Sequence, residues 1–346
     1  MVNKQMRRVV GYIFYVLIIS AFVVAMVAEL WVGTRPACEP HTPVAQDSVE
    51  IVIVGDIMAH LPQVESARVG EEAYDFTPHF EGVRPLFGAA DYVVANLETT
   101  LSPRPPYSGY PTFATPEELA RDLAAVGVDA VTLANNHITD KGAEGVLHTL
   151  AALDNAGMDY MGVGVPTVRA GRVDGLISRV GGFRVAFVAA TDILNRTVAG
   201  IDVARVDTLT LARNIASVRE RTDLVVALVH WGEEYHRVPS HRQKTMAKWM
   251  RSRGVDVVVG SHPHVIQPFE IEHNKDGKTV GAVFYSLGNF ISNQNDRNTD
   301  VGLAVRIGLH RKSAVGPIDL TIEADTIHRV RYTEGSKTHY ELKIEN

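Results

Sequence analysis

Residues 255–264 read VDVVVGSHPH, a run of β-branched residues that ends in a glycine, a serine and two histidines. Earlier runs of the same kind are Ile51–Val54, Asp91–Ala95, Val128–Ala134, Phe183–Ala190 and Leu224–Val229. Each is apolar along its length rather than alternating, which is typical of strands buried on both faces. The pattern predicts an α/β fold with a largely parallel sheet covered by helices.

Helices are expected between these strands because the sequence carries start and stop signals. Thr115 and Pro116 mark a helix start that Gly127 closes, and further helices are expected over Asp140–Asn155 and Ser240–Arg253. After about Lys278 the helical pattern stops. A second sheet of antiparallel strands is expected there, over Thr279–Tyr285, Val301–His310, Pro317–Glu323 and Ile327–Tyr332.

The composition excludes several classes of protein. Of the 346 residues, 46% are hydrophobic and 21% are charged, proportions that belong to a folded globular chain. The formal net charge of -6 offers no basic surface for nucleic acid, so no nucleic-acid partner is expected. The single cysteine, Cys38, excludes a disulfide framework and a cysteine-rich zinc site within one chain.

The N-terminal region has the pattern of a membrane segment. A run without charge extends from Val9 to Ala28 after three basic residues, and a helix of that length spans about 30 Å, the thickness of the bilayer hydrocarbon. A cleaved signal peptide is the alternative, although its apolar region is usually shorter. We predict a single-pass protein of the cell membrane with a basic cytoplasmic flank at 1–8, a transmembrane anchor at 9–32, a tether at 33–48 and an extracytoplasmic domain at 49–346.

Side chains suited to bind a metal or move a proton follow five of the apolar runs. They are Asp56, then Asn96 and Glu98, then Asn136 and His137, then His230, and finally His262 and His264. Because the carboxyl ends of strands in an open α/β sheet border one crevice, we expect these residues to meet there. Carboxylate, amide and imidazole ligands without a thiolate suit one or two divalent ions of Mn, Zn or Fe at a hydrolytic centre.

The residue types also suggest individual roles. Glu98 could bridge two ions about 3.5–4 Å apart. His137, beside a candidate ligand, could act as general acid towards a leaving group. Asn96 and Asn289 are the candidate substrate-binding residues, but Asn289 could instead orient a ligand or belong to a glycine-centred turn.

Each element has a purely structural explanation as well. Asp56 could cap a helix, and Asn136 could belong to a favoured turn pair. The segment from His262 to His264 could be an ordinary proline turn. The same coincidence at five strand ends nevertheless favours a functional site.

At these residues the sequence resembles a known family, the CapA-type proteins of poly-γ-glutamate capsule synthesis, which belong to the calcineurin-like metallophosphoesterase superfamily. The resemblance spans Glu50 to Ile291. It rests on six motifs in order, namely GDIM (55–58), ANLET (95–99), LANNH (133–137), HWGEEY (230–235), GSHPHVIQP (260–268) and YSLGNFI (285–291).

The resemblance implies a four-layer α/β/β/α sandwich on the outer face of the membrane. It also implies ligand roles: Asp56 and the bridging Glu98 as carboxylates, Asn136, His230 and His262 on one ion, His264 on the other, and His137 as the acid. The wider superfamily begins with Asp-x-His, whereas this chain has Met58 at the third position. A thioether is a poor ligand for Mn or Mg, so one metal position is weakened unless His60 compensates.

Three functions stay open from the sequence. The favoured one is a membrane-anchored protein of poly-γ-glutamate biosynthesis or transport, with an anionic polymer and membrane ligase and transport subunits as partners. The others are a metal-dependent hydrolase of other phosphoesters or γ-linked amides, and a non-catalytic polymer-handling subunit. Residues 47–98 carry a net charge of -8 and would repel an anionic polymer, so arginines would have to offset that field, with Arg104, Arg237, Arg242 and Arg297 as candidates.

Overall fold

A computed structural model of the chain describes residues 48–167, 170–312 and 316–345. The predicted cytoplasmic flank, the transmembrane anchor and the tether up to residue 47 lie outside these ranges. Within them, none of the helices combines the length and the apolar character needed to cross a bilayer. Ser48, the last residue of the predicted tether, begins the first strand.

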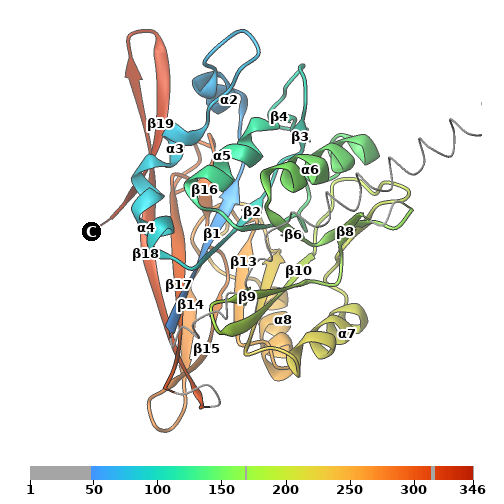
Figure 1. Cartoon of the computed structure of the whole chain (residues 1–346), viewed down its shortest axis with the longest axis vertical. Helices are drawn as coiled ribbons and strands as arrows, with labels where there is room; N and C mark the ends of the chain where they lie inside the picture. Colours follow the sequence, from blue (N-terminus) through green and yellow to red (C-terminus); the bar gives the residue numbers. More distant parts are fainter. Residues whose placement is uncertain (1–47, 168–169, 313–315, 346) are drawn as a thin grey trace, which may run out of the picture. The chain divides into compact units, whose positions relative to one another are not determined.

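The described residues build one large sheet of 14 strands (Figure 1). Its first half is parallel and contains β6 (Asp159–Met161), β5 (Ala130–Thr132), β2 (Tyr92–Leu97) and β1 (Ser48–Ile57) in that spatial order. Its second half contains four parallel strands, namely β15 (Thr279–Phe284), β13 (Val257–Ser261), β12 (Leu224–His230) and β10 (Phe183–Thr191). Two antiparallel strands complete it: β9 (Leu176–Val180) pairs with β10, and β14 (Phe269–His273) pairs with β15. The mixed α/β fold predicted from the apolar runs is confirmed.

The expected second sheet is wrong. β17 (Val301–Arg311) pairs with β1 over seven residues, and β18 (Ile318–Glu334) pairs with β17 and touches β15 through one residue pair. The C-terminal strands therefore connect the two parallel halves, and β18 runs unbroken through two segments expected to be separate strands. Periodicity identifies a strand but does not identify its hydrogen-bonding neighbour, which is why the sequence could not show this connection.

The other short strands lie around this sheet. β19 (Lys337–Ile344) pairs with β18, and β16 (Asn289–Ile291) pairs with β1. Two small separate sheets contain β3 (Leu101–Ser102) with β4 (Thr115–Pro116), and β11 (Asp202–Val203) with β7 (Val163–Val165) and β8 (Ala170–Arg172).

The helices follow the expected stop signals more closely than the expected start signals. Thr115 and Pro116 pair with β3, so the helix predicted from Thr115 begins only at Glu118. Gly127 and Gly157 end their helices with left-handed backbone, as predicted, and Ser240 caps the third predicted helix. The helices are α2 (Leu61–Ala67), α3 (Thr77–Phe80), η1 (Glu81–Val83), α4 (Arg84–Ala89), α5 (Glu118–Val126), α6 (Gly142–Ala156), α7 (Thr208–Arg219) and α8 (His241–Ser252).

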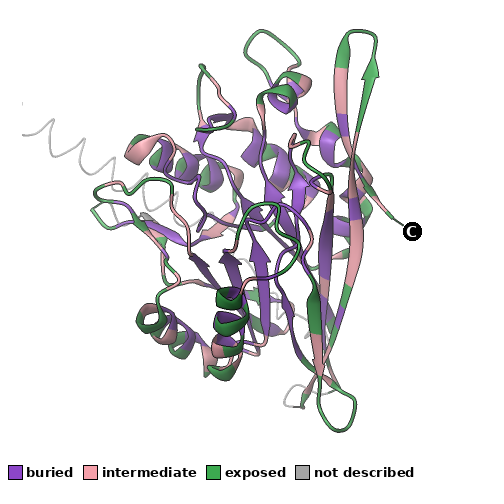
Figure 2. Cartoon of the chain, turned by 180° about the vertical axis from the view of Figure 1, so that it is seen from behind, coloured by how far each residue is buried: buried purple, intermediate pink, exposed green. Residues whose placement is uncertain are grey.

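Three apolar cores lie between the layers of the fold. Along β1, Val52 and Val54 pack into a core that includes residues of α5 and α6, whereas Ile51 and Ile53 point to the opposite side. On that side they share a core with β10, β12 and β13, so the two halves of the sheet pack face to face. A third core joins β10 and β12 to α7 and α8. The order is helices, half-sheet, half-sheet, helices, with the strands buried between (Figures 1 and 2).

Candidate metal centre

The residues singled out at the strand ends come together at one end of the sheet. Asp56 in β1 lies opposite Asn96 of β2 on one side and Asn289 of β16 on the other. The remaining candidates lie at the ends of their strands or in the loops that follow. All nine are at most 4% exposed, namely Asp56, Asn96, Glu98, Asn136, His137, His230, His262, His264 and Asn289.

Asp56 organises one side of this cluster. Its Oδ1 accepts a hydrogen bond of 2.8 Å from Asn96 Nδ2, and its Oδ2 accepts one of 3.3 Å from the backbone N–H of His262. His264 Nδ1 lies 3.1 Å from the same Oδ2. One carboxylate thus fixes residues from β2 and from the loop after β13.

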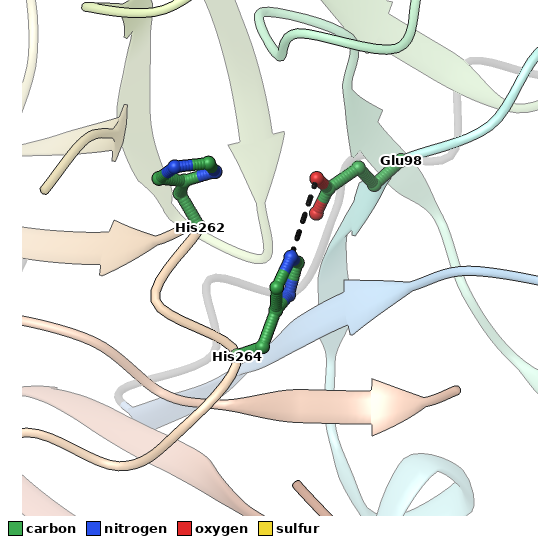
Figure 3. A group of neighbouring side chains, drawn as sticks. All are labelled: Glu98, His262 and His264. Atoms are coloured by element: carbon green, nitrogen blue, oxygen red, sulfur yellow. Dashed lines mark ion pairs between the residues drawn. The ribbon is translucent and has the colours of Figure 1, made fainter. Parts of the chain in front are cut away.

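The loop after β13 holds both of its histidines in unusual backbone conformations. His262 and His264 have positive φ values of 96° and 58°, which L-residues adopt rarely outside functional sites and turns. His264 Nδ1 is within 3.1 Å of both Asp56 Oδ2 and Asn289 Oδ1, so Nδ1 is placed to donate a hydrogen bond and Nε2 faces away from both. That Nε2 points towards Glu98, 3.9 Å from Oε1 (Figure 3).

His230 and Asn136 form the opposite side. His230 Nε2 lies 2.8 Å from Asn136 Oδ1 and 3.4 Å from Glu98 Oε1. On the other edge of the ring, Nδ1 lies 2.9 Å from Ser261 Oγ. The hydroxyl can therefore orient the ring while Nε2 and the amide oxygen of Asn136 face the same point.

Glu98 lies in the middle of the cluster. It belongs to two groups whose ligand atoms lie within 4.8 Å of one another, one with His262 and His264 and the other with Asp56 and His230. Its buried Oε1 accepts no hydrogen bond within the part of the chain that the structure describes. Burial, and next the Asp56 carboxylate, raise the pKa of Glu98 well above its usual value. A cation shared by the two groups would remove that electrostatic cost.

The imidazoles also fit a metal. Burial, with a smaller contribution from neighbouring imidazoles, lowers the pKa of His262 to about 3 and that of His230 well below its usual value. Both rings are therefore neutral at pH 7, the state that binds a cation. His262 Nδ1 is buried and has no hydrogen-bond partner among residues 48–167, 170–312 and 316–345. Carboxylate, amide and imidazole donors together fit a divalent ion of the Mn, Zn or Fe type.

His137 differs from the other histidines because its ring pairs with a carboxylate outside the cluster. Its Nδ1 lies 2.7 Å from Asp140 Oδ2, which also accepts a 2.7 Å hydrogen bond from the backbone of Phe113. The Phe113 ring packs edge-on against the imidazole, with 4.8 Å between centroids. Asp140 thereby fixes the ring and holds a proton on Nδ1, which leaves Nε2 to exchange a proton with a substrate.

Asn96 and Asn289 contact other protein side chains in this arrangement. Besides Asp56, Asn96 Nδ2 lies 3.4 Å from His230 Nδ1. The Asn289 contact with His264 is the geometry of the ligand-orienting alternative, and direct contact with substrate stays a prediction for both residues.

His60 joins neither of the two groups of candidate ligands found in the described residues. Met58 is buried. His60 Nδ1 accepts a 3.2 Å hydrogen bond from the backbone of Asn293, and its ring packs edge-on against Phe113. The arrangement gives no support to His60 as a replacement ligand.

Three partners of the site were not assigned a role from the sequence. Asp140 follows His137 by three residues, a spacing that could have suggested the contact. Asn135, adjacent to a candidate ligand, donates to the side chain of Asn96 and to the backbone of Leu97. Ser261 lies within the GSHPH motif, but no sequence signal connects its hydroxyl to a histidine 31 positions earlier.

Fold and site define a mixed α/β protein with a buried cluster of ligands suited to divalent metal ions. The chain belongs to the bacterial capsule synthesis protein family, whose model, described as PGA_cap, matches residues 50–294. The family predicted from the six motifs is therefore confirmed.

Two curated relatives agree with this assignment. The chain is 32% identical over 309 residues to a capsule biosynthesis protein CapA from Bacillus anthracis, covering 85% of this chain and 71% of the relative. It is 27% identical over 328 residues to a PGA biosynthesis protein CapA from Bacillus subtilis, covering 92% and 82%. Among solved structures, a 5'-nucleotidase from Candida albicans aligns with a TM-score of 0.46 and 13% identity, over 80% of this chain and 51% of the nucleotidase.

Proposed function

We propose that this chain is a membrane-anchored, extracytoplasmic protein of poly-γ-glutamate biosynthesis or transport, and that it acts on the polymer through a metal-dependent hydrolytic centre. The names of its relatives, a capsule biosynthesis protein and a PGA biosynthesis protein, support the polymer as substrate. The uncharged run at residues 9–28 after a basic flank supports the anchor.

One observation carries the catalytic part of the proposal. Glu98 belongs to both ligand groups, and its buried Oε1 lacks a hydrogen-bond donor in the described part of the chain. An ionised carboxylate without compensation is costly in a protein interior, so a cation is the natural partner. A bound divalent ion would supply Lewis acidity that polarises the scissile group and acidifies water.

The residues of the chain would do the remaining work. Glu98, His262 and His264 would hold one ion, and Asp56, Glu98 and His230 the other, with Asn136 beside His230. His137 would give the proton on its Nε2 to the amine or alkoxide that leaves, while Asp140 keeps the proton on Nδ1 and fixes the ring. This arrangement serves hydrolysis of a γ-linked amide or of a phosphoester.

Metal analysis of the purified protein tests the centre directly. Elemental analysis should find a tightly held transition metal in the wild type and little in the double variant Asn136→Ala with His262→Ala. His241→Ala, an exposed histidine at the start of α8, is the matched control and should keep the metal. No metal in the wild type, or equal content in the double variant, would contradict the proposal.

Hydrolysis assays test the chemistry. With added Mn or Zn, the wild type should cleave a γ-linked glutamate oligomer or an activated phosphodiester, and His137→Ala should lose that activity while it keeps its metal and its fold. Metal binding without hydrolysis of either compound would instead favour a non-catalytic polymer-handling subunit. A reporter fused to the C terminus tests the anchor, because activity confined to the cytoplasm would refute it.

A further inference from the structure

A groove of about 440 Å³ lies outside the metal cluster. Its walls are the segment 294–300, which follows β16, and the side chains of Arg329 and Arg331 near the end of β18. The segment contributes a third arginine, Arg297, and two carboxylates, Asp296 and Asp300. None of these groove residues belongs to the two groups of candidate metal ligands.

Hydrogen bonds connect this arginine groove to the cluster in two steps. Asn289 Nδ2 donates to Gln294 Oε1 at 2.9 Å and to the Thr299 carbonyl at 3.0 Å, and both acceptors belong to residues of the groove wall. Asn289 Oδ1 in turn lies 3.1 Å from His264 Nδ1. On the same side, Gln294 Nε2 donates to the hydroxyl of Tyr235, whose ring centroid lies 6.2 Å from that of His264. Asn289 therefore links the wall of the groove to the metal cluster.

Arg329 is held in place by the groove wall and lies near the Asp300 carboxylate of the same wall. One terminal nitrogen of Arg329 donates to the Gln294 carbonyl at 3.0 Å, while its buried Nε has no hydrogen-bond partner in residues 48–167, 170–312 and 316–345. Within those same ranges, no carboxylate lies within ion-pair distance of Arg297, Arg329 or Arg331, whereas Arg242, another arginine considered from the sequence, is paired with Asp192. Guanidinium groups without carboxylate partners are ready to bind an external anion in bidentate geometry.

The carboxylates of the groove indicate which kind of anion fits. A polyphosphate offers only acceptors and negative charge, so Asp296 and Asp300 would repel it. A polyamide whose repeating unit carries a carboxylate also has an N–H group in every unit, and such groups donate to aspartate and to amide oxygens. The wall therefore offers donors for the carboxylates of such a ligand and acceptors for its N–H groups.

We infer that the arginine groove is a polymer-binding subsite that recognises a carboxylate-bearing polyamide, with Arg297, Arg329 and Arg331 on the carboxylates and the aspartates on the amide N–H groups. The inference deepens the proposed function and rests on it, because the groove would position one part of the polymer while a neighbouring linkage enters the metal cluster. Residues 47–98 carry a net negative charge that would repel an anionic polymer. An approach along the arginines of the groove would offset that repulsion.

Binding of a labelled γ-linked glutamate oligomer, measured by fluorescence anisotropy at low salt, tests this subsite. The full chain is used with a chelator present, so that binding is measured without the metal. Loss of one charge-assisted contact typically weakens binding about tenfold or more, and we expect that effect from Arg329→Gln and from Arg297→Gln. Arg179→Gln, an exposed arginine on β9, is the matched control and should stay within about twofold of the wild type.

The ligand class is tested in the same assay. Unlabelled oligomer should displace the probe, whereas polyphosphate of equal charge should displace it at least about tenfold less well. Wild-type affinity in all groove variants, or equal displacement by polyphosphate, would overturn the inference. Arg297 and Arg331 are exposed, so Arg297→Gln and Arg331→Gln decide the question even if Arg329→Gln fails to fold.

The outcomes separate this inference from the proposed function. A protein that holds a metal but does not bind the oligomer through these arginines contradicts the subsite alone. A protein that binds the oligomer through them but never holds a metal contradicts the hydrolytic centre alone.

Discussion

Because His79 in α3 is buried, we predict that the free energy of unfolding falls in acid by an amount that can be calculated. Its side chain is 2% exposed, packs parallel to Tyr340 with 5.9 Å between centroids, and has no hydrogen-bond partner on either ring nitrogen within the described residues. Burial lowers the pKa of His79 from 6.5 to about 4 in the folded protein. The unfolded chain therefore takes up a proton first as the pH falls, and the native state loses stability between about pH 6.5 and pH 4.

The size of the effect follows from the two pKa values. At one pKa unit per 1.36 kcal/mol, this residue should lower the free energy of unfolding by about 2 kcal/mol between pH 7 and pH 5. Urea unfolding followed by tryptophan fluorescence, with a chelator present, would measure the change in the wild type and in His79→Phe. The buried imidazoles of the metal centre also favour the neutral form, but they contribute equally to both proteins, so the difference isolates His79.

The stacking on Tyr340 explains why phenylalanine is the chosen replacement. It keeps an aromatic ring between α3 and β19 and removes only the titrating group. The expected result is that His79→Phe loses about 2 kcal/mol less than the wild type on going from pH 7 to pH 5. Parallel pH profiles for the two proteins would refute the reasoning.

Three further perturbations have defined outcomes. Gly260→Ala should lower the melting temperature and the metal content together, because a Cβ atom there would overlap the Tyr285 carbonyl and displace the loop that follows β13, at a cost of about 3 kcal/mol; an unchanged melting curve would contradict this. Ser240→Ala removes a cap that accepts a 3.2 Å hydrogen bond from the first turn of α8, and urea unfolding should show a loss of about 1 kcal/mol. Asp140→Asn should reduce hydrolysis about 100-fold at unchanged metal content, because it removes the carboxylate that fixes the His137 ring; full activity would exclude that role.

Much of the site could be predicted because strand ends are visible in the sequence. Asp56, Glu98, His230 and His262 each come at the end of an apolar run, and strands of a parallel sheet end at the same edge. The partners that orient these ligands follow no such rule. The contact of Ser261 with His230 depends on the register between β12 and β13, which no local pattern encodes.

The same distinction holds for the fold. Gly127 and Gly157 end their helices at the predicted positions, because the left-handed conformation is a local property that glycine adopts at little cost. Thr115 carries an equally local helix signal, yet it pairs with Leu101 in a short parallel bridge. Tertiary hydrogen bonding outweighed a preference worth about 1 kcal/mol.

The sequence by itself determined most of the buried strands, the ends of two helices, and which polar residues stand at the strand ends. Only the tertiary structure decided that β17 and β18 join the two parallel halves, that Glu98 belongs to both ligand groups, and that Asn289 links an arginine groove to them. The physical reason is that backbone conformation depends on neighbouring residues along the chain. Strand order and side-chain contacts depend instead on how apolar faces pack across hundreds of residues.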